Sequence, residues 1–191
     1  MDDPYSYFFT SQRLGFRSWS ETDIQLMAEI NADPEVMAFF PAIQSLPQTT
    51  DFIKRMQAQQ ASKGYCYFAV DRLDNKEFIG FIGLTDQSYE ADFTPCVDIG
   101  WRLKRSAWNN GFAREGAASC LAYAFTVLAL ERVYSVAPKV NVRSEHIMQR
   151  IGMHKVKEFI HPMLRDDERL GQCILYGIDS EHFTLRETNA K

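Results

Sequence analysis

The sequence predicts an α+β domain, a mixed α/β sheet that is mostly antiparallel and has helices on both faces. Apolar residues first recur with helical spacing, over residues 21–61, and then alternate as in strands over 65–103. Beyond residue 110, helix-like and strand-like segments alternate. Strands in succession followed by such alternation are typical of a mixed sheet packed between helices. A chain of 191 residues, 46% of them hydrophobic, suits one core, so we expect residues 1–191 to form one domain.

The N-terminal part should form one strand and three helices. Arg13–Trp19 alternates with a period of two, as a strand with one buried face does. Ser20 is a typical helix N-cap, and Asp23 completes an approximate capping box. Asp33 followed by Pro34 marks a second helix start. The expected helices are 21–31, 33–40 and, after a loop bracketed by Pro41 and Pro47, Thr49–Ala61.

The middle of the chain should form an antiparallel meander of three strands. Strand-like runs occur at Tyr65–Val70, Glu77–Leu84 and Cys96–Leu103, and Asp74 with Asn75 favours a turn between the first two. The remaining expected elements are a small-residue helix over about Phe112–Leu130, a strand at Arg132–Pro138, a helix at Asn141–Met153 ended by Gly152, and strands at His154–Phe159 and Cys173–Ile178.

Composition argues against several classes of protein. The formal net charge is -4 and no broad basic stripe is present, so we expect no nucleic-acid partner. The N-terminus lacks the basic start of a secretory signal. The longest run of low charge, residues 117–130, is shorter than the roughly 20 residues of a membrane span. The four cysteines show no CxxC spacing and the four histidines no HxxxH spacing, which predicts reduced thiols, a cytoplasmic protein and no metal.

The stretch WNNGFAREG, residues 108–116, lies between a predicted strand and a predicted helix. A helix N-terminus has unpaired N–H groups and a positive dipole, so it favours anions. Gly111 and Ala113 would let the backbone approach a phosphate. Basic residues surround this point on an acidic chain: Arg102, Lys104, Arg105 and Arg114. A polyphosphate site is one interpretation and an ordinary strand–helix turn is the other, since neither GxGxxG nor GxxxxGK[ST] is present.

Preceded by DIGWRL, this stretch resembles the acetyl-CoA loop of the GNAT acetyltransferases, a Q/R-x-x-G-x-G/A segment that opens their main helix. The subgroup with the greatest resemblance is the ribosomal-protein N-acetyltransferases of the RimJ/RimL type, which often have Trp at the first position. RLGFRSWSETDIQLMAEINADPEVMAFFP, NVRSEHIMQRIGM and HPMLRDDERLGQCILYGI are similar to further segments of that group. The resemblance covers almost the whole chain in the right order.

The resemblance implies a GNAT fold with a splayed pair of central strands, and acetyl-CoA as cosubstrate. The backbone of Trp101, Arg102 and Leu103 would pair with the pantetheine arm. The loop N–H groups would hold the pyrophosphate, as helix-end donors can. Asn141 would contact the cofactor or hold the strands apart, and a role as helix N-cap is an equal alternative. The residues assigned to the pyrophosphate are Asn109, Asn110, Gly111, Phe112, Ala113 and Arg114.

One position departs from the subgroup: Asn109 stands where glycine is usual. If this position requires a positive φ, asparagine tolerates it better than most other residues do. We therefore expect cofactor binding to survive the change.

Asp98 is the leading candidate for the base that accepts the amine's proton. It interrupts the apolar run CVDIGW, where a carboxylate is costly unless it is hydrogen-bonded or functional. An acidic residue often lies here in the resembled family and acts through water. A solvent-facing or structural carboxylate is the alternative, and solvent itself could take the proton.

Ser144 is the leading candidate for the acid that protonates the leaving thiolate, because it matches the serine of the family's Asn-x-x-Ser segment. Its alternative is a first-turn serine that bonds to the backbone. Tyr134 is a second candidate acid, and His161 and Glu158 could reach the substrate cleft from the late strand and loop. No Cys-His or Ser-His-Asp pattern is recognisable, as expected for direct transfer without a covalent enzyme intermediate.

The function expected from the resemblance is therefore acetyl-CoA-dependent N-acetylation of a primary amine, either a protein N-terminal α-amine or a small-molecule amine. The alternative is a non-catalytic module that binds acyl-CoA. No nucleic-acid or membrane partner is expected, and the chain would be a monomer or a homodimer.

Overall fold

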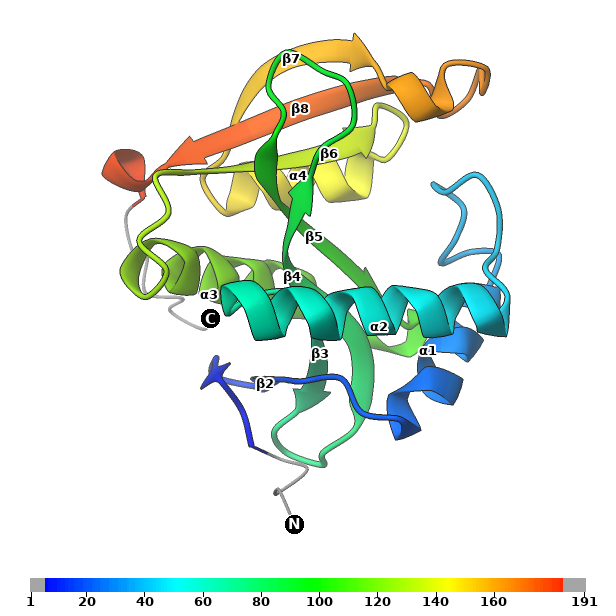
Figure 1. Cartoon of the computed structure of the whole chain (residues 1–191), viewed down its shortest axis with the longest axis vertical. Coiled ribbons are helices and arrows are strands. Elements are labelled where there is room, and N and C mark those ends of the chain that lie inside the picture. The colour runs from blue at the N-terminus through cyan, green and yellow to red at the C-terminus, as the bar shows by residue number, and fades with distance from the viewer. Residues whose placement is uncertain (1–5, 184–191) are drawn as a thin grey trace.

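An eight-stranded sheet organises the part of the chain that the computed structural model describes, residues 6–183 (Figure 1). The strand order is β1-β2-β3-β4-β5-β6-β8-β7. The strands are β1 (Phe9–Thr10), β2 (Leu14–Arg17), β3 (Tyr67–Arg72), β4 (Phe78–Gln87), β5 (Cys96–Leu103), β6 (Arg132–Pro138), β7 (His154–Ile160) and β8 (Gln172–Asp179). Within this sheet β5 and β6 run parallel, and the other neighbours are antiparallel. The predicted mixed sheet and the β3-β4-β5 meander are confirmed.

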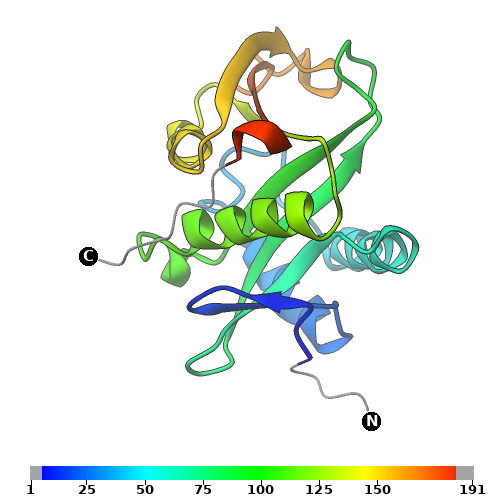
Figure 2. The ribbon, with the colours of Figure 1, turned by 90° about the vertical axis from the view of Figure 1, so that its left-hand side faces the viewer.

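Helices cover both faces of this sheet. They are α1 (Thr22–Ala32), α2 (Leu46–Lys63), α3 (Phe112–Thr126) and α4 (Val142–Arg150). Figure 2 shows α2 and α3 on opposite sides of the central strands. The close approach of α3 depends on Gly116, where a Cβ atom would lie 2.3 Å from Ile82 of β4. The small residues of α3 therefore let its first turns lie directly against the strands that carry the site.

Two predictions about the N-terminal helices are wrong. Residues 33–40 form turns, with one helical hydrogen bond from the Met37 N–H to the Asp33 carbonyl (3.0 Å). Tertiary contacts decide this segment, since Phe40 lies over the guanidinium of Arg102. Ser20 is not the N-cap of α1, which has Glu21 in that position. Asp23 instead accepts from the Ser20 N–H (2.8 Å).

The limits of two other helices also differ from prediction. The α2 helix begins at Leu46, not Thr49, because Ser45 and Gln48 form a capping box and Pro47 fits the first turn rather than a loop. The α3 helix ends at Thr126, four residues before the predicted Leu130, and Ala129 beyond it has φ +52°.

No helix in residues 6–183 combines the length and the apolar character that a membrane crossing requires.

The two parallel strands at the centre separate almost at once. Asp98 of β5 and Tyr134 of β6 are the pair in register between them. The Ser135 hydroxyl donates to the Ile99 carbonyl (2.9 Å) and fastens the strands at the point where they part. The predicted splayed strand pair is thus present, and in the described part of the chain no strand pairs with the β6 side of β5 beyond Ile99.

Candidate active site

A cleft of about 800 Å³ opens where β5 and β6 diverge. Its walls come from β5, the β5–α3 loop, β6, the first turns of α4 and the turns before α2. Of the residues that the resemblance assigned to the cofactor, together with the leading base and acid candidates, it brings together all but Asn110: Asp98, Trp101, Arg102, Leu103, Asn109, Gly111, Phe112, Ala113, Arg114, Asn141 and Ser144. Asn110 does not line it; its side chain donates to the Trp108 carbonyl (2.8 Å).

The β5–α3 loop presents free backbone donors to the cleft. Asn109 has φ +60° and Gly111 φ +77°, so both positions are left-handed, as asparagine and glycine tolerate. The Glu115 N–H donates to the Gly111 carbonyl, and no side chain caps the helix. The N–H groups of residues 112–114 therefore have no acceptor among residues 6–183. Such a set of aligned donors fits the oxygens of a phosphate.

Glu115 braces this loop against the first hairpin, and sequence reasoning missed it. Its carboxylate accepts from the Ser11 hydroxyl (2.6 Å) and from the backbone N–H (2.8 Å) and Nε (2.7 Å) of Arg13. Arg13 in turn donates from Nη2 to the Asn110 carbonyl (3.0 Å). The loop conformation is thus held by contacts with a segment about one hundred residues earlier in the chain, which no local pattern indicates.

Asp98 is buried at the point where the two strands part. Its Oδ2 accepts from the hydroxyl of Tyr67 (2.7 Å) and its Oδ1 from the N–H of Val136 (3.2 Å). Burial raises the pKa of Asp98 to about 7, and these hydrogen bonds oppose the rise without cancelling it. A carboxyl with this pKa can accept and release a proton near neutral pH, which is what a general base needs. Tyr67 is a further residue that the sequence did not single out.

Asn141 and Ser144 occupy the start of α4. The Asn141 Oδ1 accepts from the Ser144 N–H (3.2 Å), so Asn141 is the N-cap of this helix. Because Asn141 also lines the cleft, capping the helix does not keep it from the cofactor. Ser144 lines the cleft, and its hydroxyl has no hydrogen-bond partner among the residues described, so it is available as a donor.

The three remaining candidates do not line the cleft. The hydroxyl of Tyr134 accepts from Arg132 (3.4 Å), on the sheet face beside Phe93. Glu158 is paired with two lysines, which lower its pKa to about 2 and make it a poor base. His161 contacts the ring of Tyr89 (4.4 Å between centroids), and burial lowers its pKa. No cluster of metal-ligating side chains occurs in residues 6–183.

A mixed sheet whose parallel central strands diverge beside a helix N-terminus is the fold of the GNAT acetyltransferases. The chain belongs to the acetyltransferase (GNAT) domain family, whose sequence profile matches residues 13–154. It is therefore an acetyltransferase. The uncharacterized N-acetyltransferase YoaA of Bacillus subtilis is 26% identical over 150 residues, 76% of this chain and 81% of that protein.

Solved structures share the fold. A GNAT-family acetyltransferase from Bacillus anthracis superposes with a TM-score of 0.76 at 22% identity, over 90% of this chain and 98% of that one. The ribosomal-protein-S5-alanine acetyltransferase of Vibrio fischeri gives 0.72 at 14%, over 92% and 98%. The spermidine N-acetyltransferase of Vibrio cholerae, in complex with CoA and spermine, gives 0.71 at 18%, over 88% and 96%.

Proposed function

We propose that this chain, as a single domain over residues 1–191, transfers the acetyl group of acetyl-CoA directly to a primary amine. Family membership supports acetyl transfer to amines in general. The observation that supports the specific proposal is the cleft itself, which is lined both by the start of α3, with its free N–H groups, and by a buried carboxyl with a pKa near 7. The free N–H groups are suited to bind a polyphosphate, and the carboxyl is suited to accept the proton of an amine.

Acetyl-CoA would lie along the diverging edge of β5. The loop residues Asn109–Arg114 would direct backbone N–H groups at the pyrophosphate, and Arg114 would add positive charge. The backbone of Trp101–Leu103 would pair with the pantetheine arm as a neighbouring strand does, although the Leu103 carbonyl already accepts from the indole of Trp108 (2.8 Å). Asn141 would line the same arm from α4. These assignments use mostly backbone groups, which lose little entropy on binding.

The amine nitrogen would attack the thioester carbonyl, form the C–N bond and expel the thiolate. Asp98 would accept the proton that the amine loses, through a water molecule. A backbone N–H on the free edge of β5 would stabilise the negative charge on the carbonyl oxygen. Ser144 would protonate the thiolate. One proton leaves the amine and one reaches sulfur, so the reaction is balanced without a covalent enzyme intermediate.

The acceptor would be a protein N-terminal α-amine or a small-molecule amine. Likeness to the ribosomal-protein acetyltransferase from Vibrio fischeri supports the RimJ/RimL subgroup and a protein N-terminus. Likeness to a spermidine acetyltransferase supports a small amine. A cytoplasmic monomer or homodimer is consistent with both acceptors.

Two measurements test this function. Acetyl-CoA at millimolar concentration is expected to raise the Tm by mass action, because it binds only the folded state. An amine panel is expected to accelerate release of free thiol from acetyl-CoA. The absence of a thermal shift would rule out acetyl-CoA as the ligand. A shift without turnover of any amine would instead support a module that binds acyl-CoA without catalysis.

Ser144→Ala is expected to lower kcat about tenfold and to leave acetyl-CoA affinity nearly unchanged. The hydroxyl would act only in the transition state, and water can replace it in part. Initial rates of thiol release give kcat, and the thermal-shift titration gives affinity. Asn141, whose side chain caps the same helix, provides the comparison. Asn141→Ala should lower Tm and acetyl-CoA affinity together, whereas equal losses in both variants would leave Ser144 with a structural role only.

A further inference from the structure

Arg102 is a buried cation without a carboxylate partner. It is 8% exposed, lines the cleft, and takes part in no ion pair among the residues described. Its Nη1 donates to Asn31 (2.6 Å) and, more weakly, to Gln44 (3.5 Å), both neutral amides. Its Nε is buried and has no acceptor among residues 6–183. Burial lowers the pKa of Arg102 to about 10, so the group stays charged at neutral pH.

A buried charge left this way is costly, and the chain elsewhere avoids it. Arg17 is buried to a similar degree and is paired with two carboxylates. Its Nε and Nη2 form a two-pronged contact with Asp71, at 2.6 and 2.8 Å. In Arg102 the same Nε–Nη2 edge has no protein acceptor in residues 6–183. That edge has the geometry to bind one carboxylate through two hydrogen bonds.

The acidic residues nearest in sequence to the segment over Arg102 are already engaged. Arg105 donates to Asp33 (2.6 Å), which does not line the cleft, and to Glu35 (2.7 Å), which lines it but is already paired in this way. Aromatic contacts also restrain the orientation of Arg102, since its guanidinium carbon lies 4.0 Å from the ring centroid of Phe40 and 5.4 Å from that of Phe81. The site is therefore built to hold the charge in place without neutralising it.

Arg102 lies on the same face of β5 as Asp98, because side chains alternate along a strand. They are four positions apart, which places their Cα atoms roughly 13 Å from each other. An aromatic surface lies between: the ring of Tyr67 covers Gly100 and stacks on Phe81 at 4.9 Å. This face turns toward the α1–α2 side, away from the α3 side where the loop donors lie. A ligand along it would meet a base at one end, apolar rings in the middle and a cation at the other end.

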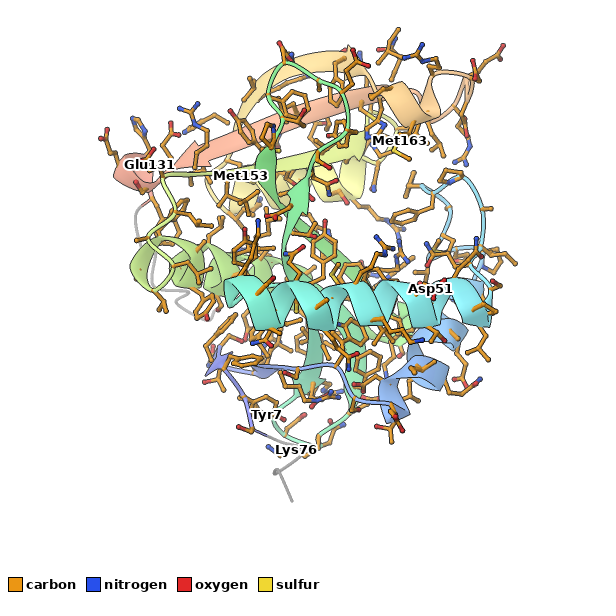
Figure 3. The ribbon with its side chains drawn as sticks, in the orientation of Figure 1. Tyr7, Asp51, Lys76, Glu131, Met153 and Met163 are labelled. Atoms are coloured by element: carbon orange, nitrogen blue, oxygen red, sulfur yellow. The ribbon has the colours of Figure 1, made fainter. Side chains whose placement is uncertain are left out.

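Two segments near this face contact each other. Arg169, in the connection between β7 and β8, donates to the carbonyl of Ala38 in the turns before α2. Figure 3 shows the side of the molecule on which these parts face each other, with Met163 labelled on the connection and Asp51 on α2. The turns that line the cleft at Ala38 are thus tied to the β7–β8 connection, and we expect this side of the cleft to admit a small molecule more readily than a folded protein surface.

We propose that the acceptor is a small amine that also carries a carboxylate, separated from the amino group by an apolar segment, and that Arg102 binds this carboxylate. The inference rests on the proposed function and names its substrate class. A polyamine would place a second cation beside an unpaired arginine, and like charges in a buried site repel. Arg102 thus selects acceptors by their charge, whereas Asp98 accepts the proton that the amine loses.

Matched acceptors test the proposal. The pairs are 5-aminopentanoate against pentylamine and 4-(2-aminoethyl)benzoate against 2-phenylethylamine, with 1,5-diaminopentane as the cationic comparison. We expect kcat/KM to be at least about tenfold higher for the carboxylate member of a pair. In Arg102→Met the ratio of the two kcat/KM values of a pair, carboxylate member over plain amine, should fall to about one. Arg102→Lys, which keeps the charge and loses the two-pronged geometry, should give an intermediate ratio.

Both acceptors of a pair are measured with the same variant. The ratio of their kcat/KM values is therefore independent of any general loss of activity in that variant. Lys104→Met is the control, because Lys104 is a cation near the same strand end that pairs with Glu77 and does not line the cleft. Its ratio should equal that of the wild type. A wild-type ratio near one, or a ratio that persists in Arg102→Met, would overturn the inference. If acetyl-CoA still raises Tm and simple amines still turn over, the proposed function survives that result.

Discussion

Asp98→Asn is expected to lower kcat by about 10²- to 10⁴-fold at pH 7.5, the range over which a general base contributes. An amide is nearly the same size as a carboxylate but cannot accept a proton at this pH. Acetyl-CoA binding should be nearly unchanged, because the loop donors lie elsewhere in the cleft. Thiol release under saturating acetyl-CoA gives kcat, and the thermal-shift titration verifies that the cosubstrate still binds.

The pH profile gives the second part of this test. Because burial raises the pKa of Asp98 to about 7, the carboxylate is lost as pH falls through that value. Wild-type kcat/KM should therefore rise with pH and level off above about 7, and Asp98→Asn should lose this inflection. If the variant keeps both the rate and the inflection, the proton goes to solvent and the inflection belongs to the acceptor.

Asp86→Asn is the matched control for that variant. Asp86 lies on the neighbouring strand β4 and, like Asp98, accepts from a tyrosine hydroxyl, that of Tyr65 at 2.6 Å. It does not line the cleft. We expect its kcat to stay within about twofold of wild type, since losing an exposed carboxylate outside the site costs little. A loss of kcat as large as that of Asp98→Asn would mean that both carboxylates affect kcat by supporting the strands. Neither would then accept a proton from the substrate.

Local patterns in the sequence predicted much of this fold. The bounds of β5 and β6 agree with the alternating runs, because each strand has a pattern of apolar residues that its position in the sheet requires. Asn141 caps α4 through its own side chain, a contact within three residues. The same locality explains Asn109, whose positive φ a small polar residue can adopt without help from distant parts of the chain.

What the sequence could not indicate are contacts between distant segments. Residues 33–40 carry a helix-start signal, yet Phe40 turns toward Arg102 of β5 instead. The Tyr67 hydroxyl that donates to Asp98 comes from another strand, and the Glu115–Arg13 contact joins the start of α3 to the first hairpin. The lack of a carboxylate partner for Arg102 depends on all of the side chains that the fold places around it. Each of these depends on which side chains the folded sheet brings together, and no period or motif encodes that.

Gly111→Ala is expected to weaken acetyl-CoA binding about 10- to 100-fold. Gly111 has φ +77°, and a side chain in the left-handed region costs roughly 1–2 kcal/mol. The loop would relieve this strain by returning to negative φ, which would turn the N–H groups of residues 112–114 away from the cleft. A dissociation constant from thermal-shift titration at several acetyl-CoA concentrations measures the loss.

Gly152→Ala separates strain from the loss of the phosphate donors. Gly152 has φ +89°, and a Cβ atom there would meet Ile178 at 3.8 Å, as open a position as that of Gly111, where Arg13 would lie at 3.5 Å. It follows α4 and does not line the cleft. Both variants should lower Tm by about 2–8 °C, the shift that roughly 1–2 kcal/mol produces in a domain of this size. Only Gly111→Ala should weaken acetyl-CoA binding; an equal affinity in the two variants would show that the loop donors do not hold the pyrophosphate.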